Sequence, residues 1–175
     1  MELVQMDQSS LESVRKASDT ILAKTNQVNI LINNAAIMAI PERQLTDDGY
    51  ELQFATYHLS HFLFFNLLKP ALLAASSPSF QSWVVMVSAA AHRVHGINAS
   101  DNYNFQNGGY TNVYMANKIE RRHGARGLHA TSFHPGIIAT GIALFLPAEQ
   151  LQAMQQDPVV LKVLKTPEQG AATTL

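Results

Sequence analysis

The chain has 175 residues, of which 47% are hydrophobic and 14% are charged, and its formal net charge is −1. This composition is typical of a folded domain and excludes a disordered chain, and the low, dispersed charge excludes the basic surface with which proteins bind nucleic acid. Because the sequence contains no cysteine, disulfide bonds and thiolate chemistry are excluded as well.

Residues 1–7 carry neither the basic start nor the long apolar stretch of a secretion signal. The most apolar segment, residues 59–75, is interrupted by polar side chains and by Pro70, which favours a buried helix over a membrane span. We therefore expect a cytoplasmic protein without a membrane span, folded as one domain over residues 1–175.

The first predicted elements are a short strand at residues 3–6 and a helix opened by a capping box that runs from Ser9 to Glu12. The apolar face of this helix is formed, at helical spacing, by Leu11, Val14, Ala17, Ser18, Ile21 and Leu22. Residues 28–32 form an apolar run with one polar member, Asn29, which is typical of a strand buried on both faces.

A long helix is predicted next, from about Asp47 to Leu68. Thr46, Asp47 and Asp48 can cap its start and place negative charge at the positive end of the helix dipole. Pro70 interrupts the helical pattern just beyond the predicted end.

The second half of the chain continues the alternation of strands and helices. A strand is predicted at residues 84–87, a helix at residues 113–122 and another strand at residues 128–133. Residues 134–158 have the least regular pattern and are expected to form a loop or lid, and a further helix opens at Thr166 with a proline at its first position. The alternation predicts an α/β fold with a parallel sheet.

Residues 28–36, Val-Asn-Ile-Leu-Ile-Asn-Asn-Ala-Ala, resemble the fourth strand and NNAG turn of short-chain dehydrogenases/reductases. Four more stretches resemble segments of that family in the same order, at residues 1–14, 49–62, 83–92 and 127–140. The chain is similar to the branch that contains retinol dehydrogenases and WW-domain oxidoreductases. The resemblance implies an α/β fold with an incomplete Rossmann-type, doubly wound parallel sheet, in which the first two strands and the last strand are missing.

The missing strands have two consequences. The glycine-rich TGxxxGxG turn, which seats the cofactor's pyrophosphate in this family, is not in the sequence. The strand at residues 28–32 would be an exposed apolar edge, unless residues 3–6 pair with it or another chain covers it.

The resemblance also implies an NAD(P) cofactor. Small residues after the fourth strand let the backbone approach the cofactor, and asparagine amides can hold neighbouring main chain. In the family, an aspartate after the third strand lies near the adenine, and the segment after the sixth strand meets the nicotinamide. The implied cofactor-binding residues are Asp7, Asn33, Asn34, Ala35, Ile138 and Thr140.

Catalysis in this family depends on a tyrosine that exchanges a proton with the substrate oxygen, and a lysine four residues later lowers the pKa of its phenol. Tyr114 and Lys118 match this spacing, which places both side chains on one helix face. The family's catalytic serine corresponds to Ala89, so the serine candidate is Ser88. The predicted catalytic residues are therefore Tyr114, Lys118 and Ser88.

An alternative interpretation makes Tyr114 and Lys118 a solvated surface pair. Their neighbours resemble the later turns of the family's catalytic helix, and the segment AYGQSK, which carries the catalytic pair in relatives, has no counterpart. An internal deletion of roughly nine residues would shorten the helix by about 13 Å. In addition, Tyr57 stands where the family has a catalytic asparagine.

The resemblance implies an oxidoreductase that transfers hydride between NAD(P) and a small apolar carbonyl or alcohol, with catalysis impaired in this chain. The alternative is a non-catalytic remnant, either an interaction partner or the product of a truncated gene model. Phe62, Phe64 and Phe65 lie on a helix that often packs between subunits in the family, so a homo-oligomer is expected. No metal site is expected among the seven histidines, because neither a cysteine nor an HExxH pattern accompanies them.

Overall fold

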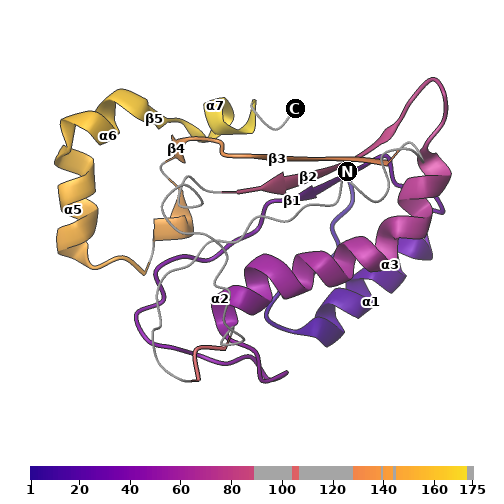
Figure 1. Ribbon diagram of the computed structural model, residues 1–175, viewed down its shortest axis with the longest axis horizontal. Coiled ribbons are helices and arrows are strands. Elements are labelled where there is room, and N and C mark those ends of the chain that lie inside the picture. The colour runs from indigo at the N-terminus through magenta and orange to yellow at the C-terminus, as the bar shows by residue number, and fades with distance from the viewer. Residues whose placement is uncertain (89–103, 107–127, 139, 144, 173–175) are drawn as a thin grey trace.

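The centre of the computed structural model is a three-stranded parallel sheet with two helices on one side of it (Figure 1). The structure describes residues 1–88, 104–106, 128–138, 140–143 and 145–172. The helix predicted at residues 113–122 lies outside these ranges. Within them, no helix combines the length and the apolar character that crossing a bilayer requires.

The sheet consists of β1 (Ile30–Asn33), β2 (Ser82–Val87) and β3 (Leu128–Phe133) in the order β1-β2-β3. Both neighbouring pairs are parallel, which confirms the predicted parallel sheet and the strands predicted at residues 84–87 and 128–133. β1 begins two residues later than predicted, because the backbone N–H of Val28 donates to the carbonyl of Ala71 instead of joining the ladder.

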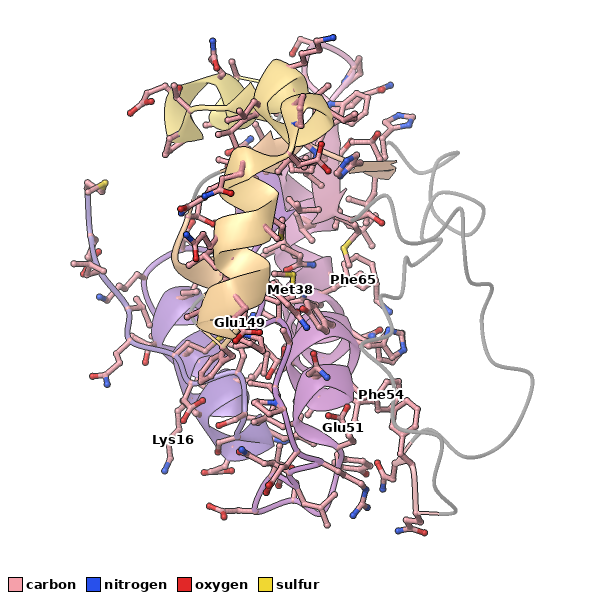
Figure 2. The ribbon with its side chains drawn as sticks, turned by 90° about the vertical axis from the view of Figure 1, so that its left-hand side faces the viewer. Lys16, Met38, Glu51, Phe54, Phe65 and Glu149 are labelled. Atoms are coloured by element: carbon pink, nitrogen blue, oxygen red, sulfur yellow. The ribbon has the colours of Figure 1, made fainter. Side chains whose placement is uncertain are left out.

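The strand predicted at residues 3–6 is wrong. Residues 1–7 run beside the first helix without joining a strand, and Leu3 is 91% exposed. Glu2 forms an ion pair with Lys24 beyond the far end of that helix, and Figure 2 shows the amino-terminal segment standing apart from the rest of the ribbon. With no neighbouring strand to bond, the segment keeps an extended course but no ladder.

β1 is consequently an edge strand among the described strands, as expected for the incomplete sheet. Ile30 and Ile32, which share one face of β1, are 51% and 40% exposed, whereas Leu31 is buried on the other face. The expectation that this strand is buried on both faces is therefore wrong for the face that carries the two isoleucines.

The first helix is α1 (Leu11–Leu22), and it buries the apolar face that its periodicity predicts. Its cap lies one residue later than the predicted capping box, because the Ser10 hydroxyl, not Ser9, accepts the N–H of Ser13. The carboxylate of Asp48 accepts the N–H of the first helical residue at 2.9 Å. Asp48 thus stabilises the start of α1 rather than the start of its own helix.

The long helix consists of three consecutive parts: α2 (Leu52–Phe54), the π-helix η1 (Ala55–Leu59) and α3 (Ser60–Ala75). The predicted start at Asp47 is wrong, because residues 45–51 form a turn closed by a bridge between Leu45 and Glu51. Pro70 lies inside α3 without ending it.

Glu51 caps this long helix. Its two carboxylate oxygens accept the N–H groups of Gln53 at 2.9 Å and Phe54 at 2.7 Å, and the side chain is buried (Figure 2). A carboxylate bonded to the unpaired N–H groups of a first turn stabilises the helix start. The preceding turn passes through Gly49, whose φ of +82° places it in the left-handed region.

The hydrophobic core lies between α3 and the sheet, and α1 packs against α3 (Figure 1). Its buried members are Leu31, Phe65, Leu68, Leu72, Val84, Met86 and Leu128. Complete burial of one such side chain contributes about 1.5–3 kcal/mol. The core therefore fixes the long helix over β1 and β2, and with it the loops at the carboxyl ends of these strands.

The carboxyl-terminal region contains β4 (Ile137–Ile138), the 3-10 helix η4 (Gly141–Ala143), α5 (Ala148–Gln156), α6 (Pro158–Val163) and β5 (Leu164–Lys165). β4 and β5 form a separate two-stranded parallel sheet. The expectation of an irregular loop at residues 134–158 is wrong where α5 forms. Neither α5 nor α6 buries a residue.

The last helix is α7 (Pro167–Ala171), which confirms the helix predicted to open at Thr166. The Thr166 hydroxyl accepts the N–H of Gln169, and the Gln169 side chain accepts the N–H of Thr166, so the two residues form a complete capping box.

Candidate functional site

The carboxyl ends of the three parallel strands lie next to one another. Asn33 pairs in register with Met86, and Val87 pairs with Phe133, so Asn34, Ser88 and the turn after β3 follow at the same edge of the sheet. In Figure 1 the helices α5 and α6 lie beyond this edge. In open α/β sheets, ligands bind outside the carboxyl ends of the strands, and we refer to this part of the molecule as the carboxyl edge.

The residues of the predicted cofactor turn after β1 differ in their exposure to solvent. Asn33 is 3% exposed, and its amide nitrogen donates to the sulfur of Met86 at 3.1 Å. Asn34 and Ala35 are exposed. Asn33 therefore links β1 to β2 from the helix-covered side, and Asn34 and Ala35 are the members of the turn that a ligand can reach.

The turn after β3 carries the other predicted cofactor residues. It passes through Gly136, whose φ of +105° is in the region that favours glycine, and continues into β4 with Ile138 half-buried. Thr140 is exposed, and its hydroxyl accepts the N–H of Ile142 at 3.4 Å. The structure thus brings Ile138 and Thr140 to the edge at which Asn34 and Ala35 lie.

Among the predicted catalytic residues, Ser88 is half-buried and directly follows β2 at the carboxyl edge. Tyr114 and Lys118 lie outside the described residues, as does Ala89. The described part of the edge offers amide and hydroxyl groups that can orient a ligand.

Asp7 lies beside the amino end of α1, apart from the sheet. Its carboxylate accepts the backbone N–H of Ser9 at 2.8 Å and the hydroxyl of Ser9 at 2.7 Å. These bonds, with the hydroxyl contributing most, lower the pKa of Asp7 below its ordinary value. Its backbone N–H donates to the hydroxyl of Ser13, so the bonds of Asp7 lead the chain into the helix.

The π-helix η1 is a feature that the sequence pattern did not predict. It contains Tyr57, which stands where the family resemblance expects an asparagine. π-Helical turns inside α-helices occur frequently at functional sites, because they free backbone groups from the regular ladder. No glycine or proline lies in residues 55–59, so propensity gives no signal for the change of helix type.

His61, two residues after the end of η1, is a buried neutral base. It is 5% exposed, and burial lowers its pKa to about 4, with a smaller contribution from the neighbouring His58 in the same direction. A hydrogen bond with the backbone of Tyr57 opposes this shift, and Nε2 has no partner among the described groups. Its burial separates His61 from solvent, so it is a structural residue of the long helix.

The two histidines of this helix do not form a metal site within the described part of the chain. His58 lies between the rings of Phe54 and Phe62, with ring centroids 5.3 Å and 6.0 Å away. No group of three or more histidine, cysteine, aspartate or glutamate side chains gathers closely enough there to hold an ion.

Comparisons with known proteins give consistent results. The family model described as enoyl-(acyl carrier protein) reductase matches residues 1–175. A short-chain dehydrogenase/reductase of Penicillium roqueforti is 42% identical over 185 aligned positions, which cover 100% of this chain and 54% of that protein. Retinol dehydrogenase 14 of Homo sapiens is 34% identical over 98% of this chain and 52% of its own length. The chain thus spans about half the length of the curated relatives it matches.

Solved structures show the same fold. The 3-oxoacyl-[acyl-carrier protein] reductase of Brucella melitensis, in complex with NAD, superimposes with a TM-score of 0.65 at 17% identity, over 99% of this chain and 69% of that one. The RhlG/NADP complex of Pseudomonas aeruginosa gives a TM-score of 0.57 at 17% identity, over 90% of this chain and 58% of that one. Together with the partial parallel sheet, these likenesses confirm the predicted incomplete Rossmann-type fold.

Proposed function

This chain belongs to the short-chain dehydrogenase/reductase family, and from that premise we propose that its carboxyl edge forms the nicotinamide side of an NAD(P) site. The site is built for hydride transfer between the cofactor and a small apolar carbonyl or alcohol, and catalysis is impaired in this chain. In this proposal residues 1–175 form one partial NAD(P)-binding domain.

The single observation that carries the proposal is that two turns lie at the same edge of the sheet. The parallel strands β1 and β3, which flank β2, place the exposed Asn34 and Ala35 at the same edge as the turn that leads through Gly136 to Ile138 and Thr140. A glycine with positive φ and a small exposed alanine let backbone approach a flat ring closely, and amide and hydroxyl groups can orient it. These residues fit the nicotinamide end of the cofactor, which supplies or accepts the hydride when bound.

The proposed impairment rests on internal positions of the chain. Ala89, which has no hydroxyl, stands where the family's serine holds the substrate oxygen, and Tyr57 stands where the family has its catalytic asparagine. The alignment with the Penicillium relative has 185 positions although this chain has 175 residues, so the relative contains a further ten or so residues. This difference supports an internal deletion in this chain, and the family resemblance of the residues around Tyr114 places that deletion before Tyr114, which makes Tyr114 and Lys118 a surface pair.

The first experiment measures cofactor binding by isothermal titration calorimetry. We expect no saturable heat for NADPH or NADH at micromolar concentration. Calorimetry does not depend on Trp83, whose ring is tilted against that of His129 near the amino end of β2, roughly 13 Å along the strand from the carboxyl edge. Micromolar saturation would show that cofactor binding is intact, and turnover of an aliphatic aldehyde at about 1 s⁻¹ or faster would show that catalysis is not impaired.

The second experiment tests the location of the nicotinamide side directly. Reduced nicotinamide mononucleotide, added at millimolar concentration to protein labelled at isoleucine δ1-methyl groups, is expected to shift the signal of Ile138 and not that of Ile21 on α1. Ile138→Val removes the signal and thereby assigns it, and adenosine monophosphate is the matched control ligand. An unchanged Ile138 signal at saturating ligand would refute the proposed site.

A second candidate function is a non-catalytic role in self-association, which the apolar surface of α6 favours. Val159, Leu161 and Val163 are each at least half exposed although the helix buries no residue. On α3, Phe62 is also exposed. Sedimentation of the wild-type chain and of Leu161→Asp distinguishes the outcomes. Identical monomers in both would exclude association through α6.

A further inference from the structure

We propose that Lys165 and Gly170 position the turn after β3, so that β5 and α7 fix the segment from Pro135 to Ile138. The inference rests on the proposed function of the carboxyl edge, because Ile138 is the residue expected to meet the nicotinamide. It adds to that function two positioning residues, which lie about thirty residues further along the chain and carry no reacting group themselves.

Lys165 holds the turn from one side with both its charge and its stem. Its ammonium group donates to the backbone carbonyl of Pro135 at 3.0 Å. Its methylene stem lies against Gly136, where an added Cβ would be 3.0 Å from Cδ and 3.1 Å from Cε of the lysine. A hydrogen bond from a charged donor stabilises a carbonyl more strongly than one from a neutral donor. Lys165 therefore stabilises the carbonyl of Pro135 and restricts the movement of Gly136.

Gly170 holds the same segment from the other side. A Cβ added at Gly170 would be 2.0 Å from Cδ1 and 3.0 Å from Cγ1 of Ile138, closer than atoms in contact can lie. The backbone of α7 therefore packs directly on the Ile138 side chain and limits its rotamers. The capping box of Thr166 and Gln169 fixes the first turn of α7, and thereby the place of Gly170.

These contacts are needed because the ladder beneath them is short. β4 and β5 pair only at Ile137 with Leu164 and at Ile138 with Lys165. Two parallel residue pairs give little stability by themselves. Without the lysine bond and the glycine contact, the turn is expected to exchange between several conformations, and the Ile138 side chain with it.

The lysine is tested with three variants of the full chain: Lys165→Met, which keeps the stem and removes the ammonium group, Lys165→Arg, and Lys162→Met on the exposed part of α6 as the matched control. Hydrogen exchange measured by mass spectrometry reports the amides of Ile137 and Ile138. We expect exchange about tenfold faster in Lys165→Met, a return to within about threefold of wild type in Lys165→Arg, and no change in Lys162→Met. Equal effects in Lys165→Met and Lys162→Met, or no effect in either, would overturn the role of Lys165.

The glycine is tested by compensation. Gly170→Ala forces the Ile138 side chain to move, and Ile138→Val removes the Cδ1 atom that the new methyl group would meet. We expect Gly170→Ala to change the ¹³C shift of the Ile138 δ1-methyl group and to raise exchange at Ile137 about tenfold. In the Ile138→Val background the same change is expected to raise exchange less than threefold. Purely additive effects of the two substitutions would overturn the packing argument.

Both tests give results whether or not the proposed function is correct. Exchange rates and methyl shifts are measured on the free protein, so a failure to bind nicotinamide mononucleotide leaves them interpretable. If Lys165→Met and Gly170→Ala loosen the turn but the mononucleotide never shifts Ile138, the positioning contacts stand and the nicotinamide site is wrong.

Discussion

Two regions of this molecule are held together by different forces. The core between α3 and the sheet is made of apolar side chains with little or no exposure, whereas α5 and α6 bury no residue. The carboxyl-terminal region depends instead on a two-residue ladder, two helix caps and the contacts of Lys165 and Gly170. The difference shows that one chain can combine a cooperative core with a region held mainly by local hydrogen bonds, which opens at lower free energy.

The largest expected effect is a loss of stability, and a matched pair of leucine substitutions compares it between the two regions. Leu72→Ala removes a fully buried side chain from the core and is expected to lower the free energy of unfolding by about 4 kcal/mol. Leu161→Ala on α6 is expected to change it by less than about 0.5 kcal/mol, because that side chain is exposed. Urea titration of the two variants measures both values, and similar losses would show that α6 belongs to the cooperative unit.

The next effect, of similar or somewhat smaller size, is the loss of folding stability at acidic pH. The folded pKa of His61 is about 4 and its ordinary value 6.5, so between these pH values the unfolded chain binds a proton that the folded chain does not. The contribution to stability is complete above pH 6.5 and is lost as the pH falls toward 4, by about 3 kcal/mol in total.

Replacing His61 by leucine should weaken this pH dependence. Urea titrations at pH 7 and pH 4.5 should differ less for His61→Leu than for the wild type. His134→Leu, at an exposed position after β3, is the control and should leave the dependence intact. A pH dependence that is the same in all three proteins would mean that the burial of His61 does not limit acid stability.

The smallest expected effect belongs to the carboxyl-terminal region. Thr166→Ala removes one half of the capping box and should destabilise α7 by about 1 kcal/mol. Exchange of the α7 amides should rise several-fold while the urea midpoint of the core stays constant. Thr20→Ala on α1, whose hydroxyl donates to the carbonyl of Lys16 in the same helix, is the matched control. A shift of the core midpoint in Thr166→Ala would show that the two regions unfold together.

The parts of the fold that were predicted correctly are those whose signal lies within a few neighbouring residues. Val84 to Val87 is an apolar run, the strand from Leu128 to Phe133 is closed by Pro135 and Gly136, and Thr166 and Gln169 form a cap by themselves. The errors arose where a distant partner decides the outcome. Residues 3–6 have strand composition but no strand to pair with, and Asp48 caps α1 across 37 residues of sequence.

The candidate site was predictable only as a set of positions at one edge. The resemblance placed Asn33 and Asn34 together, but only the structure separates a buried Asn33, bonded to Met86, from an exposed Asn34. The contact of Gly170 with Ile138 joins residues that no local pattern relates. The π-helix around Tyr57 could not be predicted from the sequence either, because helix type within a continuous helix depends on packing more than on composition.

The register of the sheet determines the order in which the molecule can assemble. Ile30 pairs with Trp83, about fifty residues later in the chain, and β2 pairs with β3 across a similar separation. Every pairing in the three-stranded sheet therefore closes a long loop. α1 and α3, in contrast, both precede β2 in the chain, and they pack on each other in the folded molecule. On the ribosome the helical pair can therefore form first, with Leu31 docking onto Leu68 and Leu72 before the sheet is continuous, and the slow step is the arrival of the later strands.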